Sequence, residues 1–164
     1  MRNLYGLLSS LIAIVLALGL YSCAADYADD IACSDIGRSL ADGLRDGQEY
    51  TEFESTHKEF YFDDTEHYDD CSLLYSRDVN DVSEIGVFHA PDAGNAGELV
   101  KDCQEYLDDL RTSTRAFVES YAPEELPKLD NAEVRRFGNY VAYAVLPTDK
   151  AEDFFDNLEK LLRG

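Results

Sequence analysis

The sequence predicts one α+β domain after an N-terminal signal segment, with two layers: a mostly antiparallel sheet and helices covering one face of it. Strand-like runs occur in two pairs, within 72–90 and 131–146, and a helical run follows each pair. The length of 164 residues suits a single domain, and no period of 20–50 residues indicates a repeat array. We therefore expect two hairpins packed against a long central helix and a C-terminal helix.

The N-terminal residues 1–22 have the pattern of a signal peptide. Arg2 precedes an uncharged run of 17 residues from Leu4 to Leu20, and small residues follow it. Removal of this segment leaves 142 residues, within which we expect residues 23–162 to form a single exported domain.

The sequence Leu20-Tyr21-Ser22-Cys23 resembles the lipobox of bacterial lipoproteins, in which the cysteine thiol receives the lipid. Tyr21 departs from that pattern because this position usually carries a smaller residue. Ordinary cleavage near Ala24 or Ala25 and an uncleaved anchor remain alternatives, since 17 apolar residues are at the short limit for a membrane span. If Cys23 is lipidated, Cys33, Cys71 and Cys103 remain. Three thiols allow at most one disulfide, whose pairing stays open.

Residues 26–45 predict the first helix, because Tyr27, Ile31, Ile36, Leu40 and Leu44 recur at near-helical spacing. Residues 46–70 predict an acidic connector with a short helix near 63–69. The runs 72–76 and 84–90 predict strands of a hairpin, joined by the polar segment 78–83.

Residues 95–121 predict the longest helix, with Asn95 and Glu98 as its N-terminal cap signature and Pro123 beyond its end. Its expected inward stripe comprises Leu99, Cys103, Leu107, Leu110, Thr114, Phe117 and Tyr121. Gly138 and Asn139 then predict a two-residue hairpin turn. The second arm, 140–146, is apolar throughout, which is typical of a central strand. A last helix begins at Thr148.

The composition limits the classes of partner. The chain has 34 Asp and Glu against 14 Lys and Arg, a net charge of −20 at pH 7. This balance excludes binding to a nucleic-acid backbone, which requires clustered basic residues. With 45% hydrophobic and 12% aromatic residues, the chain can nevertheless build a packed core.

Three runs resemble a known family: Ser83–Phe88, Gly138–Val141, and Arg111 together with Phe117, Tyr121 and Pro123. In their order and spacing they are similar to the bacterial domain of unknown function 4358, over roughly residues 26–162. The resemblance implies a short exported lipoprotein, and it supplies no catalytic residues. We take Arg111, Tyr121 and Tyr140 as candidate ligand contacts, because they lie in these runs.

We expect a non-enzymatic binding or accessory module, attached through lipid on Cys23 to the outer face of the bacterial cytoplasmic membrane, or secreted. Its partner would be an unknown protein or small molecule, with no cofactor. A secreted acidic calcium-binding protein and a cell-envelope hydrolase are the alternatives.

The sequence offers these alternatives little support. The segment Asp78–Val82 fails the EF-hand pattern at its fifth and sixth positions. His67 and Cys71 would share a face of a short helix, but a structural zinc site needs four such ligands, so we predict no metal. The sequence also contains no nucleophile elbow, zinc-protease motif or Walker loop.

Overall fold

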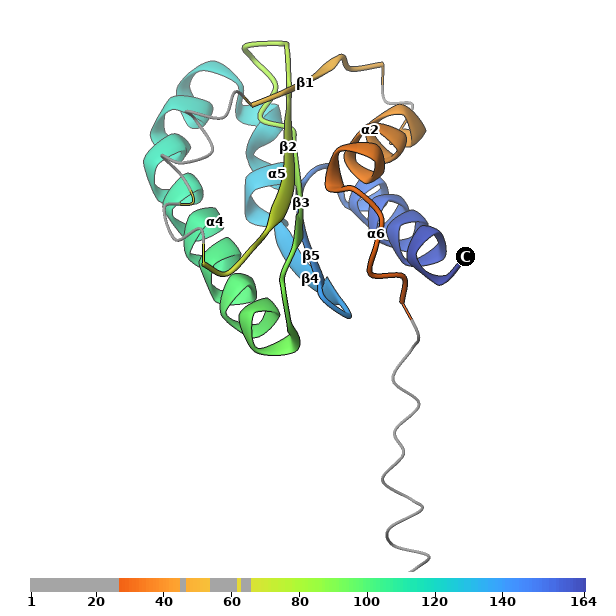
Figure 1. The fold of residues 1–164 in the computed structure, drawn as a ribbon. Coiled ribbons are helices and arrows are strands. Elements are labelled where there is room, and N and C mark those ends of the chain that lie inside the picture. The colour runs from red at the N-terminus through yellow and green to blue at the C-terminus, as the bar shows by residue number, and fades with distance from the viewer. Residues whose placement is uncertain (1–26, 45–46, 54–61, 63–65) are drawn as a thin grey trace, which may run out of the picture.

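An antiparallel sheet forms the middle of the molecule in the computed structural model, which describes residues 27–44, 47–53, 62 and 66–164 (Figure 1). The elements in chain order are α2 (Cys33–Leu44), β1 (Tyr50–Glu52), β2 (Asp70–Ser76), β3 (Glu84–His89), α4 (Ala93–Tyr121), the 3₁₀ helix η1 (Pro123–Glu125), α5 (Leu126–Asp130), β4 (Glu133–Phe137), β5 (Tyr140–Val145) and α6 (Thr148–Arg163). The five strands have the order β1-β2-β3-β5-β4, and every neighbouring pair is antiparallel. The predicted α+β class and both predicted hairpins are confirmed.

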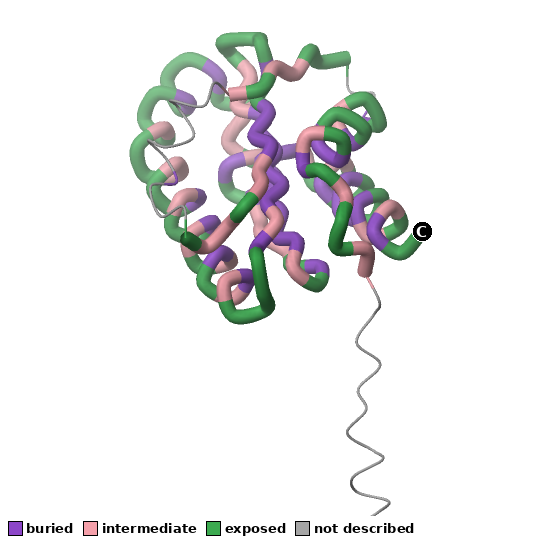
Figure 2. Tube along the Cα trace, viewed as in Figure 1, coloured by how far each residue is buried: buried purple, intermediate pink, exposed green. Residues whose placement is uncertain are grey.

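Helices cover both faces of this sheet. The helices α2 and α6 lie on one face, and α4 lies on the other with η1 and α5 (Figure 1). Purple, buried positions accordingly run along the central strands and along the sides of the helices that face them (Figure 2). The sequence pattern predicts helices on one face only. The difference arises from β3 and β5, whose apolar residues on both faces need cover from water on both sides.

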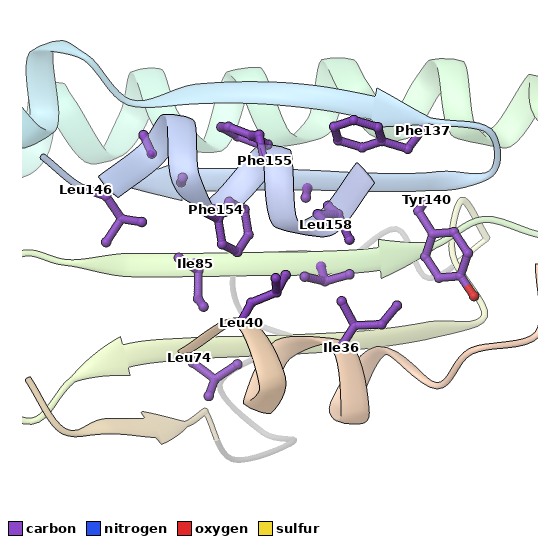
Figure 3. Close-up of a cluster of buried hydrophobic side chains, with 14 of the residues drawn as sticks. Ile36, Leu40, Leu74, Ile85, Phe137, Tyr140, Leu146, Phe154, Phe155 and Leu158 are labelled. Atoms are coloured by element: carbon purple, nitrogen blue, oxygen red, sulfur yellow. The ribbon is translucent and has the colours of Figure 1, made fainter. Parts of the chain in front are cut away.

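The core on the α2 and α6 face follows the predicted amphipathic patterns (Figure 3). Ile36 and Leu40 of α2 pack over Leu74 and Ile85, while α6 contributes the buried Phe154 and further apolar residues. The first helix, however, begins at Cys33 rather than at residue 26. Residues 27–32 form a non-helical arm, which hydrogen bonds hold against the domain.

The helix α4 ends at Tyr121 as predicted, but it begins at Ala93 rather than at Asn95. Its N-cap is Asp92, whose side chain accepts hydrogen bonds from the backbone N–H groups of Gly94 and Asn95, so Asn95 is not the cap. Leu99, Cys103 and Leu107 are buried as predicted.

Near the C-terminal end of α4, Phe117 and Tyr121 are 55% and 72% exposed, and Val118 is buried instead. The last turns of α4 lie against η1 and α5. The predicted inward stripe is therefore correct for the turns of α4 that face the sheet, but wrong for its C-terminal turns.

The connector contains the short strand β1, which the sequence analysis missed and which pairs with the end of β2. The short helix expected near 63–69 lies partly outside the described residues, and residues 66–69 form a turn and bend. The Gly138-Asn139 turn is confirmed, with a positive φ of 63° at Gly138. Within the described part of the chain, no helix is both long and apolar enough to cross a membrane.

Gly86 lies opposite Tyr143 in the register of β3 and β5. A Cβ atom at Gly86 would overlap the Tyr143 ring. We expect Gly86→Ala to lower the free energy of unfolding by about 1–3 kcal/mol, the usual cost of overpacking a core. Urea unfolding measures this change.

Gly43→Ala is the matched control, because an added Cβ at this exposed site in α2 meets no atom within 4 Å. Alanine should raise the free energy of unfolding there by about 0.5–1 kcal/mol. Equal effects of the two substitutions would contradict the packing argument.

Candidate functional site

A cleft of about 600 Å³ lies between α2 and the edge of the sheet formed by β1 and β2. Ala41 and Leu74 contribute apolar surface, and Tyr50 adds an aromatic ring. Arg38 of α2 and Arg77, which follows β2 directly, bring two guanidinium groups to the same cleft. The site therefore combines a partly apolar lining with two guanidinium groups and two carboxylates, those of Asp42 and Glu49.

Each of these arginines has an exposed carboxylate partner. Arg38 lies 3.9 Å from Asp35, and Arg77 lies 3.2 Å from Glu49. All four side chains are between 64% and 80% exposed, and ion pairs in such positions contribute little to stability. A carboxylate or phosphate on a ligand could therefore replace these partners, and guanidinium groups suit such anions because they can donate two hydrogen bonds at once.

A buried carboxyl group lies elsewhere, beneath α4. Glu84 accepts hydrogen bonds from the hydroxyls of Tyr106, at 2.7 Å, and of Tyr143. Burial raises the pKa of Glu84, although both hydroxyls act in the opposite direction, and burial together with the nearby Glu84 charge raises the pKa of Tyr143. Because Tyr143 is fully buried and Glu84 nearly so, this cluster is closed to a ligand and belongs to the core.

A second polar cluster joins the loop between β2 and β3 to α5. Lys128 Nζ lies 2.7 Å from Asp81 Oδ1 and 2.6 Å from Glu125 Oε2. Burial acts to raise the pKa of Asp81, but hydrogen bonds from Lys128 and Ser83 outweigh it and lower this pKa well below its usual range. The Lys128 ammonium thus serves as the cation for Asp81 of this loop and for Glu125 of η1. The described residues include no group of three or more His, Cys, Asp or Glu arranged to hold a metal ion.

The arm before α2 is fixed to the domain by Tyr140 and His89. The Tyr140 hydroxyl accepts from the backbone N–H of Ile31 at 2.9 Å and donates to its carbonyl oxygen at 2.7 Å. His89 lies between two carboxylates, with Nδ1 2.7 Å from Asp69 and Nε2 3.0 Å from Asp29. Tyr140, one of the candidate ligand contacts, is therefore fully buried and binds the chain itself.

The other two candidate contacts lie on α4. Arg111 donates to the carbonyl oxygens of Leu129 and Ala132 and pairs with Asp108, so it holds the segment between α5 and β4. It also lines a second, smaller cleft, of about 340 Å³. Tyr121 is exposed at the C-terminal end of α4. The structure does not bring these two residues together with Tyr140, which packs on the opposite face of the sheet.

The cysteines and His67 also have defined surroundings. Cys23 lies outside the described residues. Among the described residues, Cys33, Cys71 and Cys103 form no disulfide, and burial raises the pKa of both the Cys33 and Cys103 thiols. His67 Nδ1 lies 2.6 Å from Asp102, whereas Cys71 belongs to β2, so these two residues share no helix face.

A comparison with protein-family models matches residues 46–146, more than half of the chain, to "Domain of unknown function (DUF4358)". The chain belongs to this family. The DUF4358 match contains all five strands and α4, and thus Tyr50, Leu74 and Arg77 of the cleft, whereas Arg38 lies before it. No curated protein and no solved structure matches the chain.

The His89 contacts predict a pH dependence. Partial burial lowers the pKa of His89, but hydrogen bonds to Asp69 and Asp29 outweigh it and raise the pKa above its ordinary value of about 6.5. The stability that this group contributes is complete below the unfolded pKa and is lost as pH rises through the higher folded pKa. We expect His89→Gln to remove this loss from the pH profile of the free energy of unfolding.

Urea unfolding of both proteins between about pH 5 and 9 measures the difference, in the range set by the ordinary histidine pKa. Asp29→Asn, which retains one carboxylate partner of His89, should give an intermediate slope. Parallel profiles for the wild type and His89→Gln would contradict the assignment.

Proposed function

We propose that this DUF4358 protein is an exported bacterial lipoprotein without enzymatic activity, anchored through Cys23, that binds a small anionic ligand in the cleft between α2 and β1. The observation that carries the ligand class is the convergence of Arg38 and Arg77, which are far apart in the sequence, on one partly apolar cleft. In a chain with a net charge of −20, two arginines in one concave site favour a carboxylate or phosphate ligand.

The arrangement of the arm supports the anchor. Cys23 precedes Tyr27, the first described residue, by only four positions. Contacts of Ile31 and Asp29 hold the arm that follows against the domain. Lipid at Cys23 would therefore keep the domain close to the membrane. The strand β1 and the loop 77–83 lie at the opposite end of the molecule from the start of the arm before α2 (Figure 1). In this orientation, the β1 side of the cleft faces away from the lipid.

The positions of the titratable groups favour binding over catalysis. Glu84 and Tyr143 have raised pKa values, but the Tyr143 hydroxyl donates a hydrogen bond to Glu84 in the core beneath α4. Lys128 is likewise bound to Asp81 and Glu125. None of these groups lines the cleft, whose charged residues are Arg38, Arg77, Asp42 and Glu49. The two guanidinium groups can hold an anion but are poor acid–base catalysts.

The anchor is tested with Cys23→Ala. If Cys23 carries lipid, the wild-type protein should incorporate a radioactive fatty acid. It should also fractionate with membranes, because several acyl chains together anchor a protein stably. The variant should lose the label and leave the washed membrane fraction. Ser22→Ala, which keeps a small residue before Cys23, is the matched control and should behave as the wild type. A Cys23→Ala protein that stays with membranes would overturn the lipid anchor.

The ligand class is tested by thermal unfolding of the full chain with inorganic phosphate or succinate at constant ionic strength. A ligand that binds the folded state raises Tm in a saturable way. We expect the double variant Arg38→Ala, Arg77→Ala to weaken the apparent affinity at least tenfold, since two charge-assisted hydrogen-bonding groups are removed.

Lys160→Ala serves as the control, because it removes a positive charge from the exposed side of α6, outside the cleft. It should leave the affinity unchanged. An equal Tm response in the wild type and the double variant, or no saturable response to either anion, would overturn the proposed ligand class.

A further inference from the structure

The outer edge of β4 has no neighbouring strand, because β4 ends the sheet and pairs only with β5. The two-residue turn makes Phe137 and Tyr140 a hydrogen-bonded pair, after which bonded and non-bonded positions alternate. Val134 and Arg136 therefore direct their backbone N–H and C=O groups outward. Within the described part of the chain, no backbone hydrogen bond outside the sheet ladder satisfies these four groups.

The cleft of about 340 Å³ runs beside this edge, between α4 and β4. Val134, Leu107 and Ala132 give it an apolar side, while its polar lining consists of Gln104, Arg111, Asp108 and Glu133. In an antiparallel pair, residues directly opposite each other project to the same face of the sheet. A residue placed opposite Val134 by an added strand would therefore direct its side chain to the cleft.

The strand β4 carries two arginines against one acid, Glu133, although the chain as a whole is acidic. Arg136 is exposed, and its Nε donates to the carbonyl oxygen of Gly138. Arg135 pairs with Glu133 and lies over the Phe155 ring at 4.4 Å, and its side chain remains 39% exposed. Acidic side chains opposite Arg135 and Arg136 would complement both faces of β4.

We propose that the β4 edge binds an extended segment of a partner protein by adding it to the sheet as an antiparallel strand. The segment carries two acidic residues, opposite Arg136 and Arg135, followed by an apolar residue opposite Val134. Its backbone pairs with the outward groups of Val134 and Arg136, and its apolar side chain enters the cleft beside Leu107.

A second copy of this chain fits the edge less well. The two-fold register that pairs Val134 of one copy with Arg136 of the other uses all the outward backbone groups. That register places Arg135 directly opposite Arg135 of the other copy. Like charges at directly opposite positions are destabilising, so the edge favours an acidic partner over itself.

The test uses the ¹⁵N-labelled full chain in detergent and a blocked peptide, Thr-Glu-Glu-Val-Thr-Thr, in the low millimolar range. We expect the amide signals of Val134 and Arg136 to shift in a saturable way and their hydrogen exchange to slow at least tenfold. Val134→Pro, which removes an outward N–H that the sheet does not use, should abolish the response.

The charge requirement is tested with Arg136→Glu, which should weaken the peptide at least tenfold and prefer a Thr-Lys-Lys-Val-Thr-Thr peptide. Lys160→Glu makes the same charge change on α6 and should behave as the wild type. Unshifted Val134 and Arg136 amides, or equal binding by Arg136→Glu and Lys160→Glu, would overturn the proposal. Concentration-dependent protection of these amides without peptide would also overturn it, in favour of self-association.

Discussion

Burial of β3 and β5 on both faces is the constraint on which the rest of this structure depends. Every residue of β5 is buried, with Tyr140 packed on the α2 and α6 side and Tyr143 on the α4 side. A sheet with such strands at its centre is stable in water only if helices cover both faces. The family match, residues 46–146, includes α4 but neither α2 nor α6. The folding unit therefore extends beyond the match at both ends, because without α2 and α6 one apolar face would be exposed.

The elements that could be predicted from the sequence are those whose local pattern and tertiary role agree. The run at 140–146 has no polar position, Gly138-Asn139 provides a specific turn, and α6 has a continuous apolar face. The elements that could not be predicted depend on distant partners. The strand β1 exists because it pairs with β2, and the last turns of α4 face η1 and α5, so Phe117 is exposed where the stripe placed it inside.

The residues of the candidate site depend even more on contacts between distant parts of the sequence, so they were harder to predict. Arg111 and Tyr140 were selected as ligand contacts from local runs, but both bind backbone groups of their own chain. The cleft residues Arg38 and Arg77 are 39 positions apart, and no spacing pattern marks such a pair. Glu84 gave no signal among 34 acidic residues, although its strand alternation places it on the same inward face as Gly86 and Phe88. A local motif can single out a residue, but only the fold shows whether its side chain lines a cleft or bonds to the backbone of its own chain.

The attachment of the arm to the domain has a mechanical consequence. Besides the Tyr140 contact, the backbone N–H of Ala28 donates to the carbonyl oxygen of Leu162, and the Tyr27 hydroxyl donates to Glu159. A force applied at the N-terminus therefore reaches α6 and β5 through several bonds that share the load, before it can pull on α2. A domain tethered at this end would therefore lose the contacts of the arm with α6 and β5 before its sheet separates.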